Sequence, residues 1–104
     1  MLLHKQYDGD LVAVGKGEML TAVTDTKGAA SYVAIEHVTG ALNGREGSFV
    51  LHHLGTMVEG TDHLAIGIVA ASGTGQLTGI SGEFTLKVVE GEHRFELAYE
   101  LPAG

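Results

Sequence analysis

The sequence contains no cysteine and no tryptophan, and Pro102 is its single proline. Without cysteine the chain has no disulfide framework, no thiolate nucleophile and no zinc–thiolate site. Its 16 glycines follow no triplet period, which excludes collagen, and the near absence of proline argues against a low-complexity linker. Long apolar runs are also lacking: the longest uncharged one, residues 64–71, is far below the roughly 20 residues that a membrane-spanning helix needs.

Positive charge is scarce as well. Six lysines and arginines stand against thirteen aspartates and glutamates, which gives a formal charge of −7. The basic residues are scattered rather than clustered, so we expect neither nucleic acid nor an anionic membrane surface as a partner. No charged n-region with a following apolar run opens the sequence, so we expect no signal peptide and a cytoplasmic location.

The length of 104 residues fits one domain, residues 1–104, with a single core. Apolar residues make up 44% of the chain and charged residues 18%, which is too apolar and too weakly charged for intrinsic disorder. Many glycines among short apolar runs indicate many turns, and therefore β-structure.

The clearest local pattern lies in residues 83–101. In residues 92–101 the mostly charged side chains fall on one face, and the opposite face carries His93, Phe95, Leu97, Tyr99 and Leu101. Residues 83–88 alternate in the same way, and a short glycine-containing connection, residues 89–91, joins the two runs. A period of two marks a half-buried strand, so this region predicts a β-hairpin.

Three central runs, residues 30–39, 48–57 and 62–71, are apolar on both faces. A buried helix is the alternative for runs of this length, but their β-branched content and the glycine turns between them favour strands. Upstream, residues 11–24 read as a long strand in which two glycines predict a bulge or bend.

Short turns between successive runs predict an antiparallel meander of six or seven strands. The fold class we expect is therefore all-β, with the meander closed into a β-barrel because closure removes exposed strand edges. A β-sandwich is the structural alternative.

A glycine-rich segment carries a family resemblance. Residues 72–82, Ser-Gly-Thr-Gly-Gln-Leu-Thr-Gly-Ile-Ser-Gly, resemble the turn that precedes a late strand in the allene oxide cyclase and dirigent barrels. The chain as a whole is more similar to a bacterial domain-of-unknown-function family assigned to the same barrel superfamily. The matching stretches are residues 17–20, 32–36, 44–51 and 53–57.

This resemblance implies a small meander barrel with a central cavity, and it implies no reaction. Members of the bacterial family begin with a further strand before the equivalent of residues 5–7, whereas this chain starts almost there. Either the barrel closes with fewer strands, or a partner supplies the missing edge, or the chain is trimmed.

Glu36 is the first candidate catalytic residue because it interrupts an apolar run. It shares a face with Tyr32 and Ala34. If that face is the interior, desolvation is expected to raise the pKa of the carboxyl group toward neutrality, as a general acid or base requires. The alternatives are an outward-facing glutamate, or an interior one paired with Arg45 or a histidine for structural reasons alone.

His53 is the second candidate catalytic residue. It follows on the next run, so a turn near residues 43–44 brings it toward Glu36. A carboxylate beside an imidazole orients the ring and selects its tautomer, as acid–base sites require. The alternative is a core histidine whose hydrogen bonding the carboxylate satisfies.

Aromatic residues supply the candidate ligand contacts, which are Tyr32, Phe49 and Tyr99. Core packing is the alternative for all three. The six histidines lack the spacing of common metal motifs, although His37, His52 and His63 would share one face of paired strands. The turn at residues 73–75 lacks the lysine of a phosphate-binding loop, so we expect no metal and no cofactor.

We therefore expect a barrel that binds a small apolar molecule in its interior, with isomerase or cyclase chemistry as an open question. A non-catalytic oligomeric domain with a packed interior is the alternative. Because the three central runs are apolar on both faces, we also expect a homodimer or higher oligomer that buries the outer face of these strands.

Overall fold

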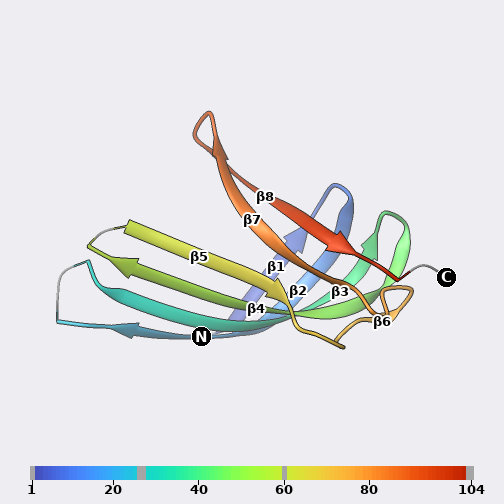
Figure 1. Ribbon diagram of the computed structural model, residues 1–104, viewed down its shortest axis with the longest axis horizontal. Coiled ribbons are helices and arrows are strands. Elements are labelled where there is room, and N and C mark those ends of the chain that lie inside the picture. The colour runs from blue at the N-terminus through green and yellow to red at the C-terminus, as the bar shows by residue number, and fades with distance from the viewer. Residues whose placement is uncertain (1, 26–27, 60, 103–104) are drawn as a thin grey trace.

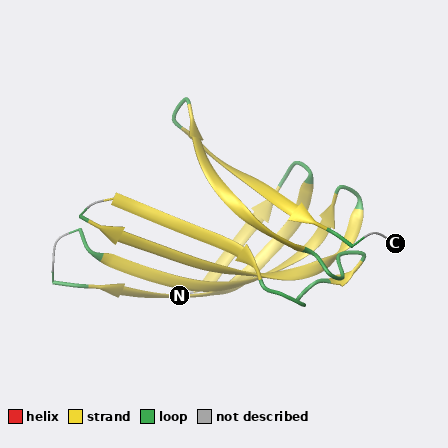
Figure 2. Cartoon of the chain, viewed as in Figure 1, coloured by secondary structure: helices red, strands yellow, loops and turns green. Residues whose placement is uncertain are grey.

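The structure is a computed structural model that describes residues 2–25, 28–59 and 61–102 (Figure 1). All of its regular secondary structure within these residues is β-strand (Figure 2). The strands are β1 (Leu2–Tyr7), β2 (Leu11–Val23), β3 (Ala30–Leu42), β4 (Arg45–Val58), β5 (Thr61–Ile68), β6 (Thr74–Gly75), β7 (Ser81–Val89) and β8 (Glu92–Glu100).

The strands form one antiparallel sheet in the order β1-β2-β3-β4-β5-β7-β8, with β6 paired to β4. The predicted meander and all of its long strands are thus confirmed. The side chains of residues 61–62, 86–89 and 92–95 lie outside the described part. For the last hairpin, the expected inner face is therefore described at Phe84, Leu97 and Tyr99.

Two-residue turns fix the register of two hairpins. Asn43 and Gly44, with φ of 49° and 81°, connect Leu42 to its ladder partner Arg45. Glu90 and Gly91, with φ of 52° and 81°, connect β7 to β8 in the same way. Positive φ at both central positions is the geometry of the type I′ turn, which matches the twist of antiparallel strands.

The sheet is not closed into a barrel, and this expectation was wrong. After the loop that carries β6, β7 shares only two ladder pairs with β5, Ile66 with Phe84 and Gly67 with Glu83. Among the described residues no ladder joins β8 to β1. The β7–β8 hairpin therefore diverges from β5 and does not complete a cylinder (Figure 1). It folds over the end of the sheet that carries the β1–β2 and β3–β4 turns (Figure 1).

Of the bulge or bend expected in the long strand β2, the structure has the bend and no bulge (Figure 1). Its ladder with β3 runs without interruption from the Leu11–Leu42 pair to the Val23–Ala30 pair. Gly15 makes room on the inner face, which is the face of the sheet turned toward the β7–β8 hairpin, whereas a Cβ atom at Gly17 would overlap the β3 backbone at Ile35 and Glu36. At Gly15, any Cβ atom would overlap the side chain of Glu36.

The core lies on the inner face, in the half of the molecule that the hairpin covers. Phe49, Leu51 and Val38 are almost completely buried there. Leu77 and Ile80 of the glycine-rich segment are buried among them, so that segment closes one end of the core. The other half of the β2–β5 sheet extends beyond the hairpin and has no such cover (Figure 1).

Candidate functional site

A buried carboxylate lies where the packed half of the inner face meets the open half. Glu36 stands on β3 opposite Gly17 and Leu51, and its side chain is completely inaccessible to solvent. An ionised carboxylate in such a place is stable only when donors and cations surround it.

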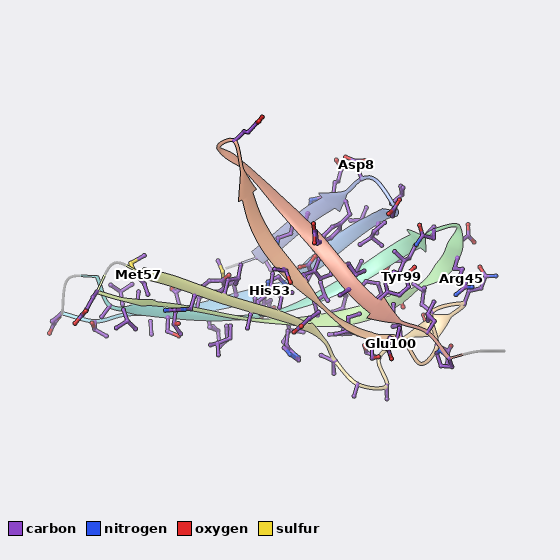
Figure 3. All side chains as sticks on the ribbon, turned by 45° about the horizontal axis from the view of Figure 1, so that its top comes forward. Asp8, Arg45, His53, Met57, Tyr99 and Glu100 are labelled. Atoms are coloured by element: carbon purple, nitrogen blue, oxygen red, sulfur yellow. The ribbon has the colours of Figure 1, made fainter. Side chains whose placement is uncertain are left out.

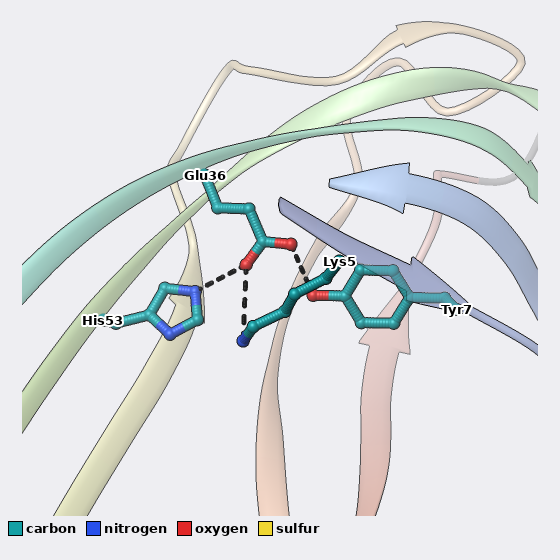
Figure 4. A network of polar contacts seen from close by, with 4 residues as sticks. All are labelled: Lys5, Tyr7, Glu36 and His53. Carbon is teal, nitrogen blue, oxygen red and sulfur yellow. Dashed lines mark hydrogen bonds and ion pairs between the residues drawn. The ribbon is translucent and has the colours of Figure 1, made fainter. Parts of the chain in front are cut away.

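Three side chains approach this carboxylate (Figure 4). His53 Nε2 lies 2.9 Å from Oε1, and the Tyr7 hydroxyl donates a hydrogen bond of 2.6 Å to Oε2. The Lys5 Nζ atom lies 3.8 Å from Oε1 and completes the network. His53 comes from β4, whereas Lys5 and Tyr7 come from β1, two strands away from Glu36.

Gly15 is the reason that β1 can reach β3. It lies on β2, between the two strands, in the ladder position opposite Lys5 and Val38. Because glycine has no side chain, the Glu36 carboxylate occupies the space above the β2 backbone and meets the β1 side chains there.

The network holds Glu36 ionised, which corrects the expected upward shift. Burial by itself raises the pKa of the carboxyl group, but the hydrogen bonds from His53 and Tyr7 and the charge of Lys5 outweigh it and hold the pKa below its ordinary value. Burial, together with the hydrogen bond to Glu36, raises the pKa of Tyr7 well above its ordinary range, so this hydroxyl keeps its proton.

The ionised carboxylate determines the tautomer of His53. A carboxylate can only accept hydrogen bonds, so Nε2 must carry the proton that it shares with Glu36. In the neutral ring the lone pair then lies on Nδ1, which points away from Glu36 (Figure 4). Glu36 therefore orients the imidazole, and in the neutral ring the proton-accepting atom is Nδ1 of His53.

Two hollows adjoin the network, and Tyr7 and Phe84 line both. The first, of about 210 Å³, lies beside Lys5 and Ile66, and Ile66 is the ladder partner of His53. The second, of about 680 Å³, lies at the gap between β1 and the β7–β8 hairpin. The rings of Tyr7 and Phe84 lie 6.0 Å apart between the two hollows. The open side of the sheet thus leads to the network.

The structure brings Glu36 and His53 together, but it separates the three expected ligand contacts. Phe49 is buried in the core. Tyr99 lies at the far end of the packed half, where Asn43 donates a hydrogen bond of 2.6 Å to its hydroxyl. Tyr32 lies in the open half, over Gly55, and lines a separate hollow of about 360 Å³. Figure 3 shows His53 between Tyr99 on one side and Met57 of the open half on the other.

Lys5 and Tyr7 were missed as site residues. Their spacing places both on one face of β1, but this pattern is common in strands and carries no chemical signal by itself. Their contact with Glu36 depends on the curvature of the sheet across β2. Within residues 2–25, 28–59 and 61–102, no three potential metal ligands converge, and this includes the three histidines on the shared strand face.

The lowered pKa of Glu36 predicts a loss of stability in acid. Since the ordinary value is 4.5 and the folded value is lower, this carboxylate contributes stability that is fully present above pH 4.5 and disappears as the pH falls through the folded value. We expect the free energy of unfolding, measured by urea titration from about pH 7 to about pH 3, to fall more steeply for the wild type than for Glu36→Gln. Equal slopes would contradict the prediction.

A second prediction concerns Gly15. We expect Gly15→Ala to lower the free energy of unfolding by about 1–3 kcal/mol, because the methyl group must displace the Glu36 carboxylate. In a Glu36→Ala background the space is free, so the same substitution should cost much less. Chemical denaturation of the four proteins of this double-mutant cycle measures the coupling. Strictly additive losses would show that the alanine acts elsewhere.

Comparisons with known proteins agree with this fold. No curated protein matches the sequence. The chain is similar to the crystal structure of a protein of unknown function from the DUF3224 family of Shewanella oneidensis MR-1, with 44% identity and a TM-score of 0.91. The match covers 100% of this chain and 78% of that one. Neither this match nor the family profile is described as an allene oxide cyclase, so that part of the expected resemblance is not confirmed.

The family profile described as "Protein of unknown function (DUF3224)" matches residues 1–99, nearly the whole chain. The expected membership of a bacterial family of unknown function is thereby confirmed. The protein belongs to the DUF3224 family.

Proposed function

We propose that the protein binds a small, largely apolar molecule on its inner face, beside the network of Lys5, Tyr7, Glu36 and His53. The observation that carries this proposal is the completely buried Glu36 carboxylate with donors from two other strands. Burying such a group is costly, and an apolar pair of the same volume often stabilises a fold as well or better. Clefts in which titratable groups are perturbed by burial and by specific partners are candidate functional sites.

The two adjoining hollows indicate what such a molecule looks like. Leu51, Ile66 and Phe84 line the smaller hollow, and Leu97 lines the larger one together with Phe84, so the body of the ligand is apolar. Lys5 and Tyr7 supply the polar lining next to Glu36. A carbonyl or hydroxyl group at one end of the ligand can accept a hydrogen bond from Lys5, and a hydroxyl group can also donate to the oxygen of Tyr7, whose own proton goes to Glu36.

The chemistry that the network supports is proton transfer. Glu36 is a weak base because its pKa is low, so its role is to position His53. His53 Nδ1 accepts a proton from the ligand, the electron pair of the broken bond moves into the ligand, and the proton is returned at another atom. Such an isomerisation or ring closure needs no oxidant and no metal, and Tyr7 keeps its proton, which it donates to Glu36, throughout.

A structural role is the second candidate function. Within the described part of the chain, every buried side-chain nitrogen or oxygen atom has a hydrogen-bond partner. A network that is satisfied without a ligand also suits a non-catalytic domain whose inner face is simply packed. The two candidates differ in what the loss of one hydroxyl does to ligand binding.

Ligand binding is tested with Tyr7→Phe, which keeps the ring against Phe84 and removes the hydroxyl. Native mass spectrometry of the purified protein, followed by ligand-observed NMR with small ketones and alcohols, should find a bound molecule in the wild type. We expect affinity to fall about tenfold in Tyr7→Phe, the upper end of the cost of one hydrogen bond between neutral groups. Tyr32→Phe is the matched control, because that hydroxyl lies in the other hollow and should not matter.

Two results would support the structural role instead. One is a wild-type protein to which nothing binds in either measurement. The other is an affinity that Tyr7→Phe and Tyr32→Phe lower equally, which would mean that the network does not contact the ligand.

The positioning role of Glu36 is tested by the tautomer of His53. In nitrogen-15 NMR spectra we expect the neutral wild-type ring to carry its proton on Nε2, because Glu36 accepts from that atom. In Glu36→Ala the acceptor is gone, so the spectrum should show a mixture of both tautomers. A single, unchanged tautomer in the variant would show that something other than Glu36 orients the ring.

A further inference from the structure

The outer face, opposite the core, carries an apolar patch that nothing in the described chain covers. The patch consists of side chains at adjoining ladder positions of β2, β3 and β4. Leu20 is 71% exposed, and the other three members are each 48% exposed. These members are Val33, Ile35 and Leu54.

The register makes this patch continuous. Leu20, Val33 and Leu54 stand side by side in one row across the three strands. Ile35 stands in the next row, between Glu18 and His52. A shallow hollow of about 820 Å³ lies over the same residues. Contiguous apolar surface of this kind on a soluble chain marks an interaction site.

Charge separates this patch from the rest of the molecule. The chain has a formal charge of −7, but Glu18 is the single acidic residue in the rows that contain or border the patch on β1–β4. The same rows carry Lys16 and three histidines, namely His4, His37 and His52. An acidic chain can therefore approach a second acidic chain here without strong repulsion.

We propose that a second copy of this chain covers the patch, by two-fold face-to-face packing of the β2–β4 strands. A two-fold axis parallel to β3 places β2 of one protomer over β4 of its partner. In the row of Ile35, Glu18 then faces the partner's His52, and this contact occurs twice. In the row of Val33, Leu20 packs on the partner's Leu54. Apolar groups therefore meet apolar groups, and the acid meets an imidazole.

Within one chain, Ile35 stands between Glu18 and His52, and these two residues make no contact. They lie on β2 and β4, on either side of Ile35, and adjacent strands are about 4.8 Å apart. The complementarity of the patch with itself is therefore realised between two chains. It favours a second copy over an unrelated partner.

The mass in solution provides the first test. In sedimentation velocity at tens of micromolar, the wild type should have twice the 10.8 kDa mass of the chain. Leu54→Glu should raise the dimer dissociation constant at least tenfold. Val12→Glu is the matched control, because Val12 is 58% exposed on the same strand face but eight residues from Leu20. A wild type that remains at 10.8 kDa overturns the proposal, as does a Leu54→Glu dimer as tight as the control.

The second test does not depend on the folding of an apolar variant. In a homodimer, Glu18→Lys replaces both acid–imidazole contacts by a lysine opposite His52, and His52→Glu places two carboxylates opposite one another in both contacts. Mixed in equal amounts, the two variants form a heterodimer in which Lys at 18 faces Glu at 52, and the native Glu18 faces the native His52. Native mass spectrometry with one variant nitrogen-15-labelled should show mostly heterodimer, whereas a statistical mixture contradicts the two-fold geometry.

This interface lies on the opposite face of the sheet from the ligand site. Outer-face variants should therefore bind the inner-face ligand as the wild type does. A failure of either proposal leaves the other standing.

Discussion

The negative charge of Glu36 is the constraint on which the inner face depends. A carboxylate with no solvent exposure must be compensated by neighbours, and its compensation comes from His53 on β4 and from Lys5 and Tyr7 on β1. The β1 residues have to reach across an intervening strand. Gly15 on that strand allows this, because it leaves open the space that a side chain would fill. One buried charge thereby connects four consecutive strands of the sheet.

The same network marks the boundary between two halves that differ in packing. On one side, the β7–β8 hairpin and the glycine-rich segment bury Phe49, Leu77 and Ile80. On the other, the sheet continues without a cover and exposes apolar side chains such as Val23. Because β7 pairs with β5 over two positions only, the sheet stays open near Tyr7. In the open sheet, Glu36 itself stays buried, while the hollows beside the network are lined by its partners Lys5 and Tyr7.

Local patterns predict much of this structure, and contacts across several strands explain what they miss. Alternation of side chains predicts the strands, and the turn at Asn43 and Gly44 sets the register that brings Glu36 near His53. Closure could not be predicted, because it depends on how many pairs β7 forms after a twelve-residue connection. The pKa direction of Glu36 also required tertiary knowledge. The apolar sequence around Glu36 predicts desolvation of the carboxyl group. It does not predict the contacts from Lys5 and Tyr7 of β1, because these depend on the curvature of the sheet.

The strict alternation of β3 allows one strand to serve two independent surfaces. Ala34, Glu36 and Val38 face inward, while Val33, Ile35 and His37 face outward. A slip of one residue in the ladder would exchange these sets and place an ionised carboxylate on the apolar outer face. Two features oppose such a slip: the two-residue turn to β4, and the space above Gly15 that the Glu36 side chain occupies. The buried charge therefore specifies the register, and the correct register in turn assembles the outer patch.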